Sequence, residues 1–247
     1  MSDSSFRRRI VAAFLTVLIF FGAVAYSRVA SMRESTASPA RRPTVILDAG
    51  HGGMDGGAVG VNGVLEKNLN LAVAEALRAL LVAAGIEVVM TRYDDRLLYT
   101  EEQDIPGKRK YYDLENRRKT AEMHPGSVFV SIHMNKYSEE KYSGLQVWCA
   151  DDPDSRSLAT MITSSVRASL QPENRREVKT AGKDIYLLHR AVGTAVLVEC
   201  GFLSNYEECK KLSDEDYRKE LSFSLFCAII KYLDGAADGT SPAHMSK

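Results

Sequence analysis

The sequence predicts an α/β domain with a mostly parallel, twisted sheet and helices on both faces. Short apolar runs such as 45–47, 128–132 and 195–198 are typical of strands that are buried on both sides. Longer stretches between these runs repeat their apolar residues at helical spacing. Alternation of this kind is typical of a parallel sheet covered by helices. The pattern extends over 44–234, which we interpret as a single domain.

The first strand is expected at 44–48, where an apolar run stops abruptly in a stretch of glycines. A helix is expected at 66–84, because leucine, valine and alanine recur there every three or four residues. Gly85 follows directly, and glycine is the residue most often found just beyond a helix end. The valine-rich run at 86–91 then predicts the second strand.

The middle of the domain begins with a long loop, 94–113, which we expect to border a cleft or a partner. A charged helix follows at 113–123, and the apolar run at 127–132 predicts a buried strand. A further strand is expected at 144–149.

The last part of the domain contains two helices and the central strand. We expect a helix at 154–170 with Asp154 or Ser155 as its cap, since both side chains can accept a hydrogen bond from the first turn. The run at 195–198 predicts a buried strand, and 214–233 predicts a final amphipathic helix. The residues after it, 235–247, are rich in Gly, Ala, Ser and Pro and are expected to form a flexible tail.

The N-terminal 43 residues predict export. A basic region at 1–9 precedes an uncharged apolar segment at 10–26, and a polar linker occupies 27–43. The apolar segment is close to the lower limit for a membrane span, roughly 17 residues, and Ala23–Ala25 offers a small-residue cleavage site. We interpret it as a transmembrane anchor in preference to a cleaved signal or a buried core helix. Whether the segment is an anchor or a cleaved signal, the arginines stay in the cytoplasm and the domain lies outside it.

Composition excludes some functions. The formal net charge is zero and no basic stripe interrupts the domain, so nucleic acid is not expected as a partner. The four cysteines show neither a CxxC pair nor dense spacing, and we expect mostly buried thiols, with Cys227 on the apolar face of the last helix. The sequence alone leaves the disulfide state open; the cysteines are Cys149, Cys200, Cys209 and Cys227.

Four residues are the strongest candidates for a site. His51, His133 and Glu199 each end an apolar run, and Glu66 begins the first helix. In parallel sheets, sites gather beyond the carboxyl ends of the strands, so these four residues can converge. A charged group at the end of a buried strand is costly when it is unpaired, and a bound metal ion is therefore a natural partner for these residues.

Several other residues have two open interpretations. Asp48 and Asp55 either orient a histidine or cap turns, and Asn135 either binds substrate or holds its loop. The glycines between 50 and 57 either open the site to a bulky substrate or form an ordinary surface loop. The remaining histidines are expected at the surface or at helix ends, and these are His124, His189 and His244.

Three segments make the expectation specific. LDAGHGGMDGGAVG with Glu66 following, VSIHMN, and AVLVECGFLSNYEE resemble, in order and spacing, the signature blocks of the zinc-dependent N-acetylmuramoyl-L-alanine amidases, the Amidase_3 family. The runs RKYYDLENR, PENRR and KDIYLLHRA, without wall-binding repeats, are similar to family members that act in sporulation and germination. Three departures affect loop rigidity and not the chemistry, because Ala49, Thr194 and Tyr206 stand where proline is usual in the family.

This resemblance implies a single zinc ion held by His51, Glu66 and His133, with Glu199 as the catalytic residue. Spacing alone also permits Glu199 as the ligand and Glu66 as the base. The implied substrate is peptidoglycan, cleaved between N-acetylmuramic acid and L-alanine, in the spore cortex as a step towards muramic-δ-lactam. An activating lipoprotein is an implied partner.

Two other functions stay open. The chain could be a wall-binding or scaffold protein that keeps the fold without turnover. It could also be a zinc hydrolase that acts on a different wall bond, either a peptide bond or an N-acetyl group.

Overall fold

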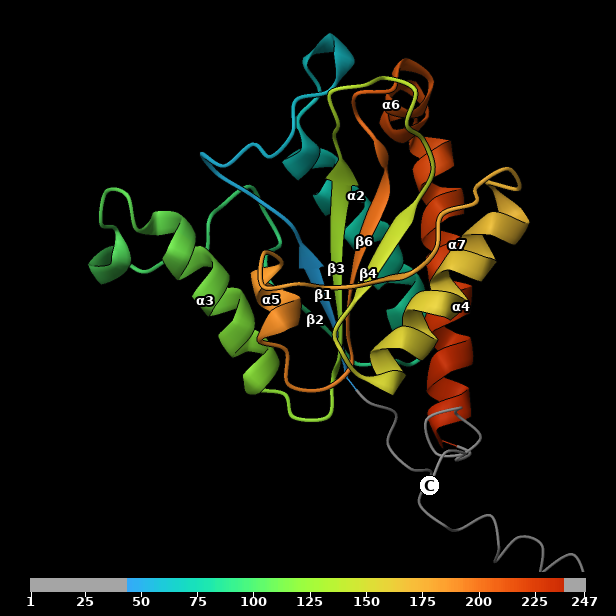
Figure 1. Cartoon of the computed structure of the whole chain (residues 1–247). Helices are drawn as coiled ribbons and strands as arrows, with labels where there is room; N and C mark the ends of the chain where they lie inside the picture. Colours follow the sequence, from blue (N-terminus) through green and yellow to red (C-terminus); the bar gives the residue numbers. More distant parts are fainter. Residues whose placement is uncertain (1–43, 238–247) are drawn as a thin grey trace, which may run out of the picture. The chain divides into compact units, whose positions relative to one another are not determined.

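The computed structural model describes residues 44–237 and contains a six-stranded sheet in the order β2-β1-β3-β6-β4-β5 (Figure 1). Neighbouring strands are parallel except β4 and β6, which are antiparallel. The α/β class and the mostly parallel sheet are therefore confirmed, and β4 makes the sheet mixed. The strands are β1 Val45–Ala49, β2 Val88–Met90, β3 Val128–Asn135, β4 Gln146–Cys149, β5 Lys179–Thr180 and β6 Ala195–Phe202.

Helices cover both faces of the sheet, as predicted. The helices α2, α4 and α7 pack against one face around the larger apolar core, and α3 and α5 lie against the other (Figure 1). The α-helices are α2 Glu66–Ala83, α3 Arg109–Glu122, α4 Pro153–Ser169, α5 Tyr186–His189, α6 Tyr206–Ser213 and α7 Glu215–Ala237, and short 3-10 helices occupy Val61–Gly63 and Glu101–Gln103.

The helical spacing in α2 buries one stripe of the helix. Leu69, Val73, Leu77 and Leu81 are each 5% exposed or less and face the core. Fully burying a side chain of this size contributes roughly 1.5–3 kcal/mol. Gly85 follows the helix with φ 77°, a left-handed conformation that glycine adopts without strain.

The two central strands are longer than the sequence predicted. His133 lies opposite Glu199, and the two strands continue beyond this pair, with a register shift before Asn135 pairs with Phe202. β3 and β6 each pair with a strand on both sides, and these backbone hydrogen bonds let the strand continue past a polar side chain. The prediction that these residues lie at the end of their strands was thus wrong in detail, although both are near the carboxyl end.

Helix boundaries also differ from the prediction. Helix α3 begins at Arg109 instead of residue 113, and α7 continues to Ala237, so the first residues of the predicted tail are helical. The cap of α4 is Asp152, whose carboxylate accepts a hydrogen bond from the Ser155 backbone at 2.8 Å, with proline as the next residue. The short elements β5, α5 and α6 were not predicted.

Three of the cysteines, Cys149, Cys200 and Cys209, are buried, and all four are free thiols. Cys227 is exposed, which contradicts its predicted place on the apolar face of the last helix. The buried stripe of α7 runs through Leu225 and Ile229, and Cys227 lies outside it.

No helix within residues 44–237 is both long enough and apolar enough to cross a membrane. The predicted basic region at 1–9, the apolar segment at 10–26 and the linker at 27–43 lie outside the described residues, as does the tail from 238.

A buried ion pair joins the sheet to α3. Asp48 is fully buried at the end of β1, and its carboxylate accepts a hydrogen bond from Arg117 at 2.6 Å. The same carboxylate accepts hydrogen bonds from Thr91 at 2.7 Å and from Ser131 at 2.6 Å. Burial by itself would raise the pKa of Asp48, but Arg117 and the two hydroxyls outweigh it and lower the pKa.

We expect Asp48→Asn to lower the free energy of unfolding at neutral pH by about 3–5 kcal/mol, because it leaves the buried Arg117 without a full counter-charge. A lowered pKa stabilises the folded state above the unfolded value of about 3.9 and loses that contribution as pH falls. The difference in unfolding free energy between wild type and Asp48→Asn, measured by urea titration, should therefore become smaller at acidic pH.

Glu215→Gln is the matched control, because it neutralises a carboxylate that forms an exposed pair with Lys219 on the surface of α7. It should leave stability unchanged at either pH. If the difference in unfolding free energy between wild type and Asp48→Asn stays constant with pH, the ionised Asp48 does not stabilise the fold through its pair with Arg117.

Candidate active site

The sheet directs the candidate residues to one face. Side chains alternate along a strand, so Ser131 and His133 share a face of β3, and Leu197 and Glu199 share a face of β6. Leu197 packs in the apolar cluster under α3 and α5, which identifies the face. The site therefore lies at the carboxyl ends of the central strands, on the side covered by α3 and α5.

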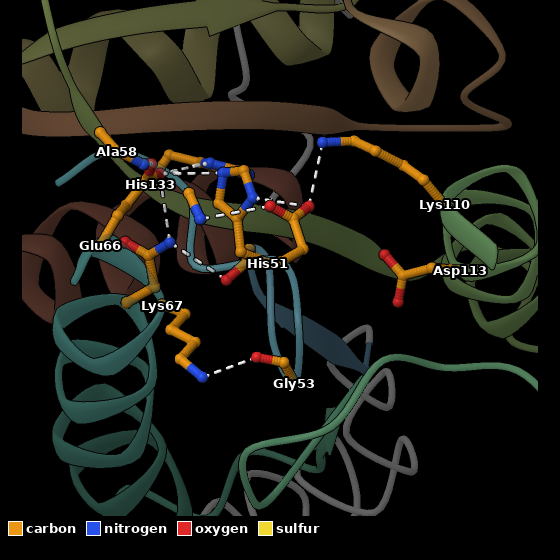
Figure 2. Close-up of polar contacts among 12 residues, drawn as sticks. His51, Gly53, Ala58, Glu66, Lys67, Lys110, Asp113 and His133 are labelled. Atoms are coloured by element: carbon orange, nitrogen blue, oxygen red, sulfur yellow. Dashed lines mark hydrogen bonds and ion pairs between the residues drawn. The ribbon is translucent and has the colours of Figure 1, made fainter. Parts of the chain in front are cut away.

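His51, Glu66 and His133 converge as the sequence predicted. One nitrogen from each histidine and one oxygen of Glu66 all lie within 4.8 Å of one another. The Glu66 Oε1 atom is 3.3 Å from His51 Nε2 and 2.9 Å from His133 Nδ1 (Figure 2). These atoms come from the loop after β1, the start of α2 and the end of β3.

Glu66 is held by hydrogen bonds from several segments. Its carboxylate accepts hydrogen bonds from the backbone N–H of Ala58 at 2.7 Å and of Met134 at 3.1 Å, and from the Asn70 side chain at 3.3 Å. Burial by itself would raise the pKa of Glu66, but the hydrogen bonds and charges of the two histidines hold it well below its usual range. The carboxylate is therefore ionised and fixed in orientation.

His51 is oriented by Asp55. Its Nδ1 atom lies 3.0 Å from Asp55 Oδ2, so Nε2 is directed toward Glu66. Burial by itself would lower the pKa of His51, but the hydrogen bonds to Asp55 and Glu66 outweigh it and raise the pKa to about 9. The negative charge around this imidazole favours a bound cation.

Two glycines allow the close packing of the site. A Cβ atom at Gly50 would lie 2.2 Å from the His133 imidazole. Gly57 has φ 66°, and a Cβ atom there would lie 2.5 Å from Glu66 Oε2 and 2.8 Å from His51 Cδ2. The glycine-rich stretch is therefore needed for the approach of these side chains. Lys67 also fixes it, by donating a hydrogen bond to the Gly53 carbonyl at 2.7 Å (Figure 2).

Glu199 lies beside the cluster in a pocket of about 270 Å³ that His51 and His133 also line. Its Oε2 atom is buried and has no hydrogen-bond partner among residues 44–237. Burial raises the pKa of Glu199 to about 7, against the charges of the two histidines, which lower it. The Glu199 carboxyl group can therefore both take up and release a proton near neutral pH.

The remaining candidates divide. Asp55 contacts a histidine, whereas Asp48 pairs with Arg117 and contacts neither histidine of the cluster in the described part of the chain. Asn135 ends β3, accepts a hydrogen bond from the Leu203 backbone at 2.7 Å, and is not among the described residues that line the pocket. Away from the site, His124 follows the end of α3 and His189 ends α5, as expected, and His244 lies outside the described residues.

Helix α3 contributes pocket residues that the sequence did not single out as candidates. Lys110, Asp113 and Arg117 line the pocket, and the Lys110 ammonium lies 2.9 Å from Asp55 Oδ2 (Figure 2). All three belong to the run RKYYDLENR, and the spacing of Asp113 and Arg117 by one helical turn was the available signal.

The donor set suits a catalytic metal. Two imidazole nitrogens and one carboxylate oxygen are the ligands of several catalytic zinc sites, which keep a further position for water or substrate. Glu66 and the two histidines come from different elements and are partly or fully buried. One nitrogen of each histidine and one carboxylate oxygen of Glu66 point toward one another. These residues therefore fit a zinc ion.

Comparisons with known proteins agree with this geometry. Residues 45–231 match Amidase_3, described as N-acetylmuramoyl-L-alanine amidase. A germination-specific N-acetylmuramoyl-L-alanine amidase of Bacillus subtilis is 33% identical over 195 residues, which cover 78% of this chain and 81% of that protein.

Solved structures show the same fold. The CwlD amidase from Clostridioides difficile, solved in complex with the GerS lipoprotein, is 41% identical with a TM-score of 0.74, and the match covers 78% of this chain and 98% of that one. The catalytic domain of CwlV, an amidase from Bacillus (Paenibacillus) polymyxa var. colistinus, is 30% identical with a TM-score of 0.65, over 78% of this chain and 98% of that one. The family match covers most of this chain, which therefore belongs to the Amidase_3 family of N-acetylmuramoyl-L-alanine amidases.

Proposed function

We propose that this chain is a zinc amidase in which His51, Glu66 and His133 hold the metal and Glu199 is the general base. The observation that carries the proposal is the convergence of three donor atoms beside a buried Glu199 oxygen that has no hydrogen-bond partner in the described part of the chain. Glu66 belongs to the cluster of donors and Glu199 does not, which favours Glu66 as the ligand over the reverse assignment.

The reaction is hydrolysis of the amide between the lactyl group of N-acetylmuramic acid and the amino group of L-alanine. Zinc supplies Lewis acidity when bound, polarising the carbonyl and making water more acidic. Glu199 Oε2 takes the proton of the attacking water and passes it to the departing alanine nitrogen. The C–N bond breaks, leaving a carboxylate on the glycan and a free amino group on the peptide.

The surroundings of Glu199 support this role. A general acid–base group works best when its pKa is near the working pH, and burial raises the pKa of Glu199 to about 7. Leu114, Leu187 and Leu197 form an apolar wall of the same pocket. This wall lowers the local water content and keeps the carboxylate poorly solvated.

The biological setting forms part of the proposal. Relatives include a germination-specific amidase and a CwlD amidase solved with a lipoprotein. We infer that this chain acts outside the cytoplasm on peptidoglycan of the spore cortex, as a step towards muramic-δ-lactam. A lipoprotein partner that promotes zinc loading, and a membrane anchor at 10–26, are consistent with these relatives and with the sequence.

The reaction is tested by product analysis on purified cortex and vegetative peptidoglycan. We expect new L-alanine amino groups and no new reducing sugar ends, with faster release from the cortex material. Added lipoprotein partner should raise zinc occupancy. Release of acetate, or amino groups of other residues, would instead indicate a different bond, and tight zinc without any release would indicate a binding protein.

The roles of the two glutamates are separated by Glu199→Gln. We expect this variant to keep zinc and lose about 10²–10⁴-fold in rate, because a general base contributes about that much. Glu140→Gln, at an exposed position, should keep full activity. Loss of zinc from Glu199→Gln, measured by metal analysis, would move Glu199 into the set of ligands.

The histidines should behave in the opposite way. His51→Ala or His133→Ala removes one of three ligands, so zinc and activity should be lost together. His124→Ala is the matched control, since His124 lies after α3 and away from the site, and it should retain both. Full zinc occupancy in either site variant would remove that histidine from the assignment.

A pH dependence is expected in the zinc-free protein. The pKa of Glu199 is raised to about 7 in the folded state, above the unfolded value of about 4.3, so its contribution to stability falls as pH rises through about 7. Glutamine does not titrate, so Glu199→Gln should not lose stability in this way as pH rises. Urea unfolding should thus show the variant gaining stability relative to wild type between about pH 5 and about pH 8; a constant difference would contradict the raised pKa.

A further inference from the structure

Three successive backbone carbonyls at the end of β1 face two buried arginines. The Ala49 carbonyl accepts hydrogen bonds from Arg92 Nε and from Arg117 Nη1, both at 2.8 Å. The Gly50 carbonyl accepts from Arg92 Nη2 at 3.0 Å, and the His51 carbonyl accepts from Arg117 Nη2 at 2.8 Å. Both arginine residues are 2% exposed.

Each arginine is itself anchored to a different element. Arg92 Nη2 also donates to the Lys67 carbonyl at 2.7 Å, in the first turn of α2 and next to Glu66. Arg117 pairs with Asp113 on α3 at 2.9 Å and with Asp48 on β1 at 2.6 Å. The end of β1 is therefore tied to both helices that border the site.

These hydrogen bonds act where the backbone is unusual. His51 has φ 61°, the one positive φ of a non-glycine residue in the described part of the chain. Such a conformation is unfavourable for a residue with a Cβ atom and persists only where surrounding contacts fix it. It also directs the His51 imidazole, because rotating this backbone would turn Nε2 away from Glu66.

We propose that Arg92 and Arg117 are positioning residues of the metal site. They hold the carbonyls of 49–51 and so fix the left-handed conformation that presents His51 to Glu66 and His133. The proposal rests on the assignment of these three residues as zinc ligands. Neither arginine acts on the substrate directly in this role.

Arginine suits this role better than lysine. A guanidinium is planar and carries five N–H donors in a fixed fork, so that one side chain can bind several carbonyls at once. Arg92 binds the carbonyls of Ala49, Gly50, Asp94 and Lys67 together. A lysine ammonium keeps the charge but cannot span these acceptors.

The test compares Arg92→Lys and Arg117→Lys with Thr91→Val in the purified full-length chain. Thr91 donates to Asp48 at 2.7 Å and, among the described residues, forms no hydrogen bond with the three carbonyls, so its variant weakens the same buried network without releasing His51. Unfolding in urea gives the stability of each protein, and competition with a chelator gives its affinity for zinc.

We expect each lysine variant to bind zinc about 10–100-fold more weakly than wild type, as is typical when the partners that orient a ligand are lost. Thr91→Val should bind zinc like wild type despite its own loss of stability. Wild-type affinity in a folded lysine variant would overturn the proposal, and so would an equal loss of affinity in Thr91→Val. One folded lysine variant is sufficient for the comparison.

A second measurement needs no metal. Nitrogen-15 NMR of the histidine rings in the zinc-free protein should show the His51 Nδ1 hydrogen bond to Asp55 in wild type and Thr91→Val, and its loss in Arg92→Lys. An unchanged signal in Arg92→Lys would overturn the proposal. If wild type itself fails to bind zinc, the proposed function fails, while this metal-free comparison still decides the role of the arginines.

Discussion

The buried pair of Asp48 and Arg117 is the interaction on which the geometry of the site depends. Asp48 lies near the end of β1 and also accepts hydrogen bonds from hydroxyls of the neighbouring strand β3 and of the residue after β2. Arg117 brings α3 against this point and continues to the His51 carbonyl. The buried pair and the hydroxyls around Asp48 thus fix β1, β3, the residue after β2 and α3 relative to one another and to the candidate ligand His51. Removing Arg117 leaves the buried Asp48 without its counter-charge, whereas removing Asp48 leaves Arg117 with Asp113 as its remaining carboxylate partner.

The same principle explains how negative charge is distributed around the site. Burial favours the neutral form of a carboxyl group unless hydrogen bonds or cations compensate for it. Glu66 is fully compensated by backbone N–H groups and histidines, so it stays ionised. Glu199 has a buried oxygen for which the described residues offer no hydrogen-bond partner, and burial raises the pKa of this carboxyl group. Two glutamates of one site therefore differ in role: Glu66 is suited to bind a metal, and Glu199 is suited to transfer a proton.

Much of the fold and of the site could be predicted. Apolar runs and helical spacing correctly located the strands around 45–49 and 128–135 and the helices α2, α4 and α7. The ends of apolar runs at His51 and His133, with Glu66 at the start of the first helix, correctly indicated that these three residues converge. Pairing between strands lengthened β3 and β6 beyond His133 and Glu199, because hydrogen bonds from neighbouring strands override the local sequence signal. Short elements such as α5 lack enough residues to show a period.

The sequence by itself determined the α/β class, the residue types of the candidate site and the family, since these depend on local periodicity and on motifs. The tertiary structure decided which charged residues support the site. Arg92 and Arg117 are distant from His51 along the chain, and on the sequence they resemble ordinary surface arginines. Their hydrogen bonds to residues 49–51 form only once α3 and the loop after β2 pack against the end of β1. Burial and orientation arise from this packing, and no local pattern encodes them.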